Sequence, residues 1–96
     1  MSLDFSKVIY RITNLREKLE SFEKVCGAGL IHDTNQHLCI MINWERIFEY
    51  YIKCPEEFKF RLHTGDSFKP TQEEFDEHFN NVLCKTEKFL ADNVKL

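Results

Sequence analysis

The sequence contains few of the features that mark membrane proteins and nucleotide-binding enzymes. It has only three Gly and two Pro among 96 residues, and no glycine-rich loop followed by Lys and Ser is present to cradle a phosphate. No apolar run approaches the roughly 18 residues that cross a bilayer. The net charge of −3 has the wrong sign for a surface that binds nucleic-acid phosphates. We therefore expect no membrane span and no direct contact with nucleic acid.

The four cysteines lack the spacing that would give them a shared role. Cys26, Cys39, Cys54 and Cys84 include no Cys-x-x-Cys pair. Charged residues interrupt the N-terminal segment, so we expect no export signal and a reducing environment. The cysteines are therefore predicted to be half-buried thiols rather than a disulfide framework.

No arrangement of residues predicts catalysis or metal binding. No Ser lies in a nucleophile elbow, and the four His show neither the His-x-His nor the His-x-x-x-His spacing of a zinc site. His37 and Cys39 would share one face of a predicted strand, but residues two apart on a strand are often neighbours without a joint role. We expect no enzymatic activity, metal or cofactor, and keep a Cys39–His37 nucleophile as an alternative.

An apolar stripe with heptad spacing dominates the first quarter of the chain. Its members recur at steps of three and four residues, which places them at positions a and d of a coiled coil. The pattern stops at Gly27-Ala28-Gly29. The stripe predicts a helix over residues 4–25 whose partner-binding side chains are Phe5, Val8, Ile12, Leu15, Leu19 and Phe22.

This stripe allows two interpretations. It can pair with a second chain, which strict 3.5-residue periodicity over a long helix favours. It can instead be the face that a helix buries against its own domain. We expect the pairing, and divide the chain into a coiled-coil neck helix (residues 1–26) and a small α+β globular head (residues 27–96).

The middle of the chain alternates between apolar and polar residues and predicts antiparallel strands. Leu38, Ile40 and Ile42 lie on one face of such a pattern, and Pro55 breaks the segment before it. Short turns between the strands indicate a meander. The predicted strands are a short one beginning at Leu30 and those of residues 37–43, 47–53 and 58–62.

Aromatic and basic residues interleave between Tyr50 and Arg61. Such interleaving can bind single-stranded nucleic acid. In a sheet this small, rings that face a helix and cations that face water explain the pattern more simply. We expect the second arrangement.

A second helix is predicted near the C-terminus, after a turn at residues 64–67. Thr71 is its expected N-cap, and Glu74 completes a capping box. Its apolar residues share one face, which suits it to cover a sheet and leaves the first helix free to project. The expected fold is α+β: a coiled-coil helix, a meander of three or four antiparallel strands, and a C-terminal helix packed on the sheet. The residues of the apolar face are Phe75, Phe79, Val82, Leu83, Thr86, Phe89 and Leu90.

This order of elements resembles the RWD-like globular heads of kinetochore proteins. The family includes the smaller globular subunit at the centromere-facing end of the four-chain outer-kinetochore rod complex. The similar segments are residues 29–31, 38–43, 58–62 and 81–90.

The resemblance implies a non-enzymatic scaffold of the nuclear kinetochore that acts in chromosome segregation. Such a subunit would form a heterodimer with a sister coiled-coil, RWD-like chain through its neck helix and head. It would also bind a peptide from a centromere-bound receptor. The alternative is an RWD-type interaction module in ubiquitin-pathway or other regulatory complexes, with the first helix packed on its own sheet.

Overall fold

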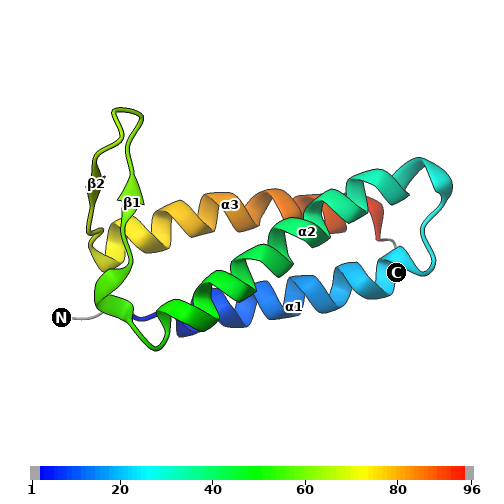
Figure 1. Cartoon of the computed structure of the whole chain (residues 1–96). Coiled ribbons are helices and arrows are strands. Elements are labelled where there is room, and N and C mark those ends of the chain that lie inside the picture. Colours follow the sequence, from blue (N-terminus) through cyan, green and yellow to red (C-terminus); the bar gives the residue numbers. More distant parts are fainter. Residues whose placement is uncertain (1–2, 95–96) are drawn as a thin grey trace.

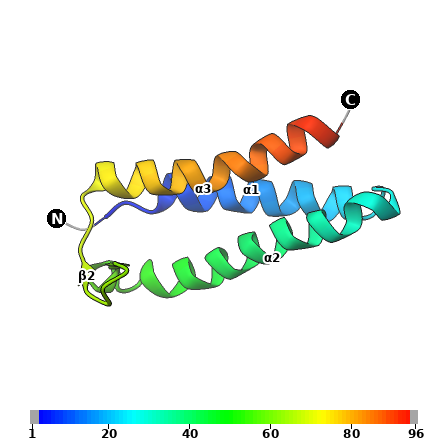
Figure 2. The same ribbon diagram turned by 90° about the horizontal axis from the view of Figure 1, so that it is seen from above.

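The computed structural model describes residues 3–94, in which three long helices lie side by side (Figure 1). They are α1 (Ser6–Glu23), α2 (Ala28–Tyr51) and α3 (Gln72–Asn93). Helix α2 runs opposite to α1 and α3, as both Figure 1 and Figure 2 show. The protein is therefore a three-helix bundle, in which α1 begins at one end and α3 finishes at the other.

The heptad stripe is the buried face of α1. The helix predicted over residues 4–25 is confirmed, and it is two residues shorter at each end. Asp4 precedes it and accepts hydrogen bonds from the backbone N–H and the hydroxyl of Ser6, at 2.9 and 2.7 Å. These bonds hold the pKa of Asp4 below its usual value, and the negative charge lies at the positive end of the helix dipole.

The strands predicted between residues 30 and 53 are wrong, because residues 30–51 belong to α2 and residues 52–53 form the turn that follows it. The short window around Leu38 alternates, but Ile40 is 44% exposed while Leu38 and Met41 are buried. Over a longer window the buried positions follow helical spacing. Residues 30–54 also contain no Gly or Pro, so nothing interrupts a helix there.

Residues 33–35, where the chain would have to turn between the first two predicted strands, also lie inside α2. Thr34 lies inside the helix and is fully buried. Its hydroxyl donates a hydrogen bond of 2.7 Å to the backbone carbonyl of Leu30, one turn earlier. This back-bond satisfies the buried hydroxyl without ending the helix.

The sheet is a hairpin rather than a meander. After the 3-10 turn η1 (Pro55–Glu57), strand β1 (Phe60–Arg61) pairs antiparallel with β2 (Ser67–Phe68), so that Phe60 lies opposite Phe68. No other strand occurs within residues 3–94. The predicted meander of three or four strands, and with it the α+β, RWD-like fold, is therefore wrong.

The turn around Gly65 is confirmed. Gly65 has a φ of +93°, a backbone conformation that favours glycine. The backbone N–H of Leu62 donates to the carbonyl of Asp66 at 2.7 Å, and that of Gly65 to the carbonyl of Leu62 at 3.0 Å. Figure 1 shows the hairpin projecting from one end of the bundle.

The predicted start of the C-terminal helix is confirmed in detail. The Thr71 hydroxyl accepts from the Glu74 N–H at 3.1 Å, and the Glu74 carboxylate accepts from the Thr71 N–H at 3.0 Å. This reciprocal pair is a capping box. The helix covers α1 and α2 rather than a sheet, and its buried residues are Phe75, Phe79, Leu83, Thr86 and Leu90.

One hydrophobic core joins all three helices. Buried residues on both sides of the boundary proposed at residue 26 belong to the same cluster. At the hairpin end this core is a group of aromatic rings. Phe79, for example, lies 4.8 Å from Phe75 and 5.2 Å from Phe48, centroid to centroid. The first helix is thus a member of the bundle and does not project.

A pair of amide hydrogen bonds closes the hairpin end. The Asp4 N–H donates to the side-chain oxygen of Gln72 at 2.8 Å, and the Gln72 side-chain nitrogen donates to the Asp4 carbonyl at 3.0 Å. Gln72 is the first residue of α3. The entry to α1 is therefore fixed directly to the start of α3.

Candidate functional site

The six residues predicted to bind a sister chain lie mostly in this chain's own core. Phe22 alone is half-buried. This placement matches the second interpretation of the stripe, a helix packed on its own domain. Apart from Phe22, the stripe offers little surface to another chain, because the exposed fractions are Phe5 3%, Val8 4%, Ile12 0%, Leu15 5% and Leu19 0%.

His37 and Cys39 do not form a catalytic pair. On α2 they point in different directions, since two residues of a helix turn through about 200°. His37 Nδ1 lies 2.8 Å from the Thr86 hydroxyl, and its ring stacks on Phe89 with the centroids 4.6 Å apart. Burial lowers the pKa of His37, although nearby Asp33 opposes the shift. Cys39 is exposed. Because both residues belong to α2, the strand geometry assumed for this alternative is absent.

The remaining chemistry of the described residues is sparse. The four cysteines are unpaired thiols, two half-buried and two exposed. Among residues 3–94, no group of three or more His, Cys, Asp or Glu side chains is placed to hold a metal ion. None of the helices described there is both long and apolar enough to span a bilayer.

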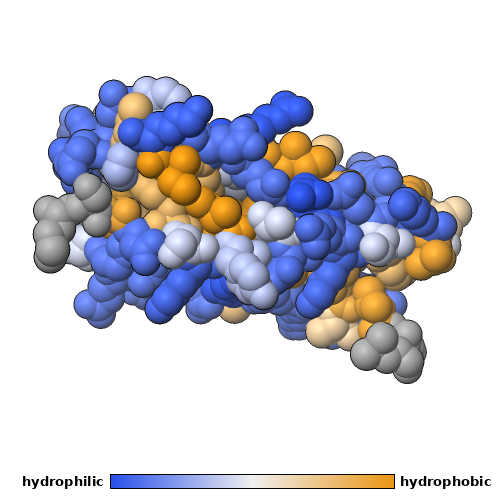
Figure 3. Space-filling model, turned by 90° about the horizontal axis from the view of Figure 1, so that it is seen from below, coloured by the Kyte–Doolittle hydropathy of each residue, from blue (hydrophilic) through white to orange (hydrophobic). Residues whose placement is uncertain are grey.

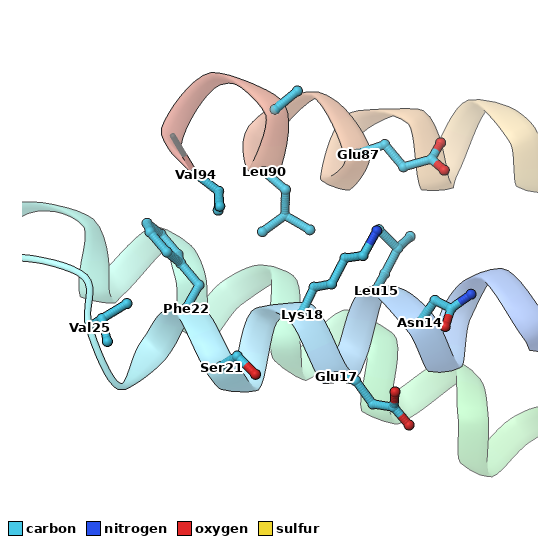
Figure 4. Close-up of a pocket in the computed structure, with 11 residues that line it drawn as sticks. Asn14, Leu15, Glu17, Lys18, Ser21, Phe22, Val25, Glu87, Leu90 and Val94 are labelled. Carbon is cyan, nitrogen blue, oxygen red and sulfur yellow. The ribbon is translucent and has the colours of Figure 1, made fainter. Parts of the chain in front are cut away.

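A groove between α1 and α3 has a largely apolar lining and a volume of about 780 Å³. We call it the α1/α3 groove. It lies at the end of the bundle opposite the hairpin, where the last turns of α3 stand apart from α1 (Figure 2). Eleven side chains line it (Figure 4): Asn14, Leu15, Glu17, Lys18, Ser21, Phe22, Val25, Glu87, Leu90, Ala91 and Val94.

Apolar side chains form the floor and mouth of this groove. Leu15 and Leu90 are buried at its base, while Val25 and Val94 are 79% and 38% exposed. Phe22 projects from α1 toward the last turns of α3 (Figure 4). Figure 3 shows apolar side chains gathered over this end of the molecule among polar neighbours. Exposed valines beside buried leucines indicate an apolar surface that continues from the core to solvent.

Small side chains leave the groove open. Phe89 is half-buried and packs edge-on against Phe22 at 6.3 Å while it stacks on His37 of α2. Beyond this contact, Ser21 of α1 and Ala91 of α3 both line the groove, and neither is large enough to fill the space between the helices.

The charges at the groove are unequally satisfied. Glu87 is bound by Arg11 at 2.6 Å. Lys18 extends from α1 toward α3, whereas Glu17 points away from α3 (Figure 4). Within the described residues, Lys18 has no carboxylate within ion-pair distance. The groove therefore presents an available cation over an apolar floor.

The heptad pattern marked Phe22 but did not reveal the groove. The stripe continues one step beyond Phe22 to Cys26, and Val25 lies outside it. Val25 is an exposed apolar residue just before the glycine break, and it was the one signal in the sequence that this end of α1 has an uncovered apolar surface.

Comparison with protein-family models, with curated proteins and with solved structures gave no match to this chain. What the protein does must therefore be inferred from its own surface.

Proposed function

We propose that the protein is a non-enzymatic interaction module that binds an amphipathic helix of a partner protein in the α1/α3 groove. The observation that carries this proposal is the continuous apolar surface of the groove beside Lys18, which has no carboxylate within ion-pair distance among residues 3–94. A helix laid along the groove would complete a four-helix arrangement and cover side chains that the three-helix bundle leaves exposed.

The groove sets the length of the partner helix. Its α1 side extends from Asn14 to Val25, which corresponds to about 16 Å at 1.5 Å per residue. A helix of about three turns matches this length. It would place large apolar side chains at i, i+4 and i+7 against Phe22, Leu90 and Val94.

The charge at the groove would set the register of the partner helix along it. An acidic side chain on the partner helix would meet Lys18 at the edge of the apolar surface. An exposed ion pair contributes only about 0–1 kcal/mol, so we expect the apolar contacts to supply affinity and Lys18 to select the register.

The kinetochore scaffold and the ubiquitin-pathway module both depended on an RWD-like head. That fold is absent, and α1 is packed in its own bundle. We therefore no longer propose a neck that pairs with a sister chain, a receptor peptide, or a nuclear, kinetochore location. What remains in the proposal is their common element, binding of another protein without catalysis.

A display library of helical peptides with apolar residues at i, i+4 and i+7 tests this function. We expect selected peptides to bind the full chain and to lose at least about tenfold in affinity, or 1.4 kcal/mol, to Ala91→Arg, which fills the groove. Ala28→Arg is the matched control, because Ala28 is also exposed on a helix but lies outside the groove. It should bind as the wild type does.

Two results would overturn the proposal. One is a selection that yields no peptide sensitive to Ala91→Arg. The other is self-association of the purified chain in sedimentation that Ala91→Arg abolishes, because the groove would then bind a second copy of this chain. For a selected peptide that carries an acidic residue, Lys18→Glu should weaken binding, and exchange of that residue for Lys should restore it.

A further inference from the structure

A second hollow lies at the hairpin end, far from the α1/α3 groove and independent of it. It has a volume of about 510 Å³ and opens between the C-terminal half of α2, the β1–β2 hairpin and α3. We call it the hairpin pocket. Half-buried aromatic side chains form much of its wall: Trp44, Tyr51, Phe60 and Phe68.

The aromatic wall is held in place by the core beneath it. Phe60 packs against Phe68 at 5.8 Å and against the buried Phe58 at 5.4 Å, centroid to centroid. Trp44 meets the buried Phe79 edge-on at 4.9 Å. Rings fixed by buried neighbours give a binding surface that loses little side-chain entropy when a ligand arrives.

Two basic side chains lie at this wall. Lys59 and Arg61 flank Phe60 in sequence, line the pocket and are exposed. Neither has a carboxylate within ion-pair distance among the described residues. In a chain of net charge −3, two available cations beside partly exposed rings form a site for an anion that also carries an apolar plane.

We propose that the hairpin pocket binds a mononucleotide. The base would stack on the aromatic wall, a contact that any base can make through its flat face. The phosphate would be bound by Arg61, whose planar guanidinium matches phosphate oxygens in bidentate geometry, and by Lys59. A pocket of this volume lies within the range of about 300–1,000 Å³ of small-ligand sites.

A single nucleotide fits this surface better than a nucleic-acid strand does. A strand requires a basic groove that follows several phosphates. The cations that line the hairpin pocket belong to one short strand, β1 and the residue before it, and the net charge of the chain is negative. The alternating aromatic and basic residues of this segment would therefore bind one base and one phosphate.

The only tryptophan of the chain lines the pocket and reports its occupancy. Titration of the full chain with adenosine monophosphate should change the Trp44 fluorescence with saturation in the micromolar to low millimolar range. Adenosine alone and inorganic phosphate alone should each bind at least about tenfold more weakly, since each supplies one of the two contacts.

Arg61→Ala should weaken binding of adenosine monophosphate by about tenfold. Arg46→Ala is the matched control, because Arg46 is an exposed arginine of α2 that does not line the pocket, and it should leave the titration unchanged. Absence of a saturable change at millimolar nucleotide would overturn the proposal, and so would equal binding by Arg61→Ala. Tighter binding of O-phosphotyrosine than of adenosine monophosphate would also overturn it, in favour of a phosphorylated peptide.

Discussion

The two ends of the bundle are built differently. At the hairpin end, the ring of Phe5, just before α1, packs against rings of α2, of the η1–β1 segment and of α3. The Asp4–Gln72 amide pair joins the segment before α1 to the start of α3. At the opposite end Phe22 of α1 meets Phe89 of α3 at 6.3 Å, and the α1/α3 groove opens beside this contact. The first end is closed and the second is open.

This difference assigns the two ends of the bundle to different tasks, stability at the hairpin end and recognition at the opposite end. Because α3 is capped and buried at its start, its last turns can stand apart from α1 without loss of the fold. Apolar side chains exposed in that region cost little, since the core does not depend on them. We infer that the closed end holds the helices together while the open end remains available for a partner.

The largest expected effect is on the closed end. Phe79 is fully buried, and Phe79→Ala should destabilise the protein by about 3–5 kcal/mol, because it leaves a cavity among rings fixed on all sides. Phe22→Ala at the open end should cost only about 1 kcal/mol, since this side chain is already half in water. Urea denaturation measures both free energies of unfolding. Equal losses would contradict the distinction between the two ends.

A smaller effect is expected where α3 begins. Thr71→Ala removes one half of the capping box and should cost about 1 kcal/mol. Thr64→Ala in the hairpin turn is the control; its hydroxyl makes only a long hydrogen bond of 3.4 Å to Asp66, so we expect a change within about 0.5 kcal/mol. The comparison uses the same urea assay. A Thr71→Ala variant as stable as the wild type would show that α3 is held by packing alone.

The two terminal helices could be predicted from the sequence because each has a long apolar stripe with a clear boundary. The stripe from Phe5 to Phe22 spans five turns, and Thr71 with Glu74 gives α3 a start signal that depends on neighbouring residues alone. The partner of each stripe could not be predicted. A helical face that is apolar at every third or fourth residue looks the same whether a second chain or the chain's own α2 covers it.

Helix α2 was mistaken for strands because short windows favour alternation. Its middle is rich in Ile and aromatic residues, which are common in strands, and Leu38, Ile40 and Ile42 alternate by coincidence. The buried positions Thr34, Leu38, Met41 and Phe48 become visible only over several turns, and a Thr among them weakens the pattern. The groove and the hairpin pocket arise from tertiary packing, and the sequence hints at the groove only through the apolar Val25 just before the glycine break.

A pH-dependent effect should appear between the two ends, at His37. Burial lowers the pKa of His37, whereas an unfolded His titrates near pH 6.5. As the pH falls through about 6.5, the unfolded chain binds a proton that the folded chain resists, so the folded state loses stability. We expect His37→Gln to be less sensitive than the wild type between about pH 7 and pH 5. Thermal denaturation across this range measures the difference.

The matched control for His37 is His32→Gln, an exposed position on the same helix. It should keep the wild-type pH dependence. If the two variants behave alike, the contacts of His37 with Thr86 and Phe89 do not restrict its protonation, and this part of the bundle is more open to water than the structure indicates.

The smallest effect is expected on the surface of the closed end, where Tyr50 of α2 donates a hydrogen bond to Glu57 of η1. This bond, together with the negative charge of Glu57, raises the pKa of Tyr50 to about 12. At neutral pH the phenol is protonated in both the folded and unfolded states, so Tyr50→Phe should leave the stability nearly unchanged there.

Above the usual tyrosine pKa of about 10, the unfolded chain releases the Tyr50 proton while the folded chain retains it. An ultraviolet titration of the folded protein should therefore show a late tyrosine transition, near pH 12, that Tyr50→Phe removes. Glu57→Gln should bring that tyrosine back toward its usual range, because the charge that opposes ionisation is gone. If Tyr50→Phe instead removes a transition near pH 10 and leaves the late one, the Tyr50–Glu57 hydrogen bond does not fix η1 to α2. The closed end would then consist of its buried rings alone.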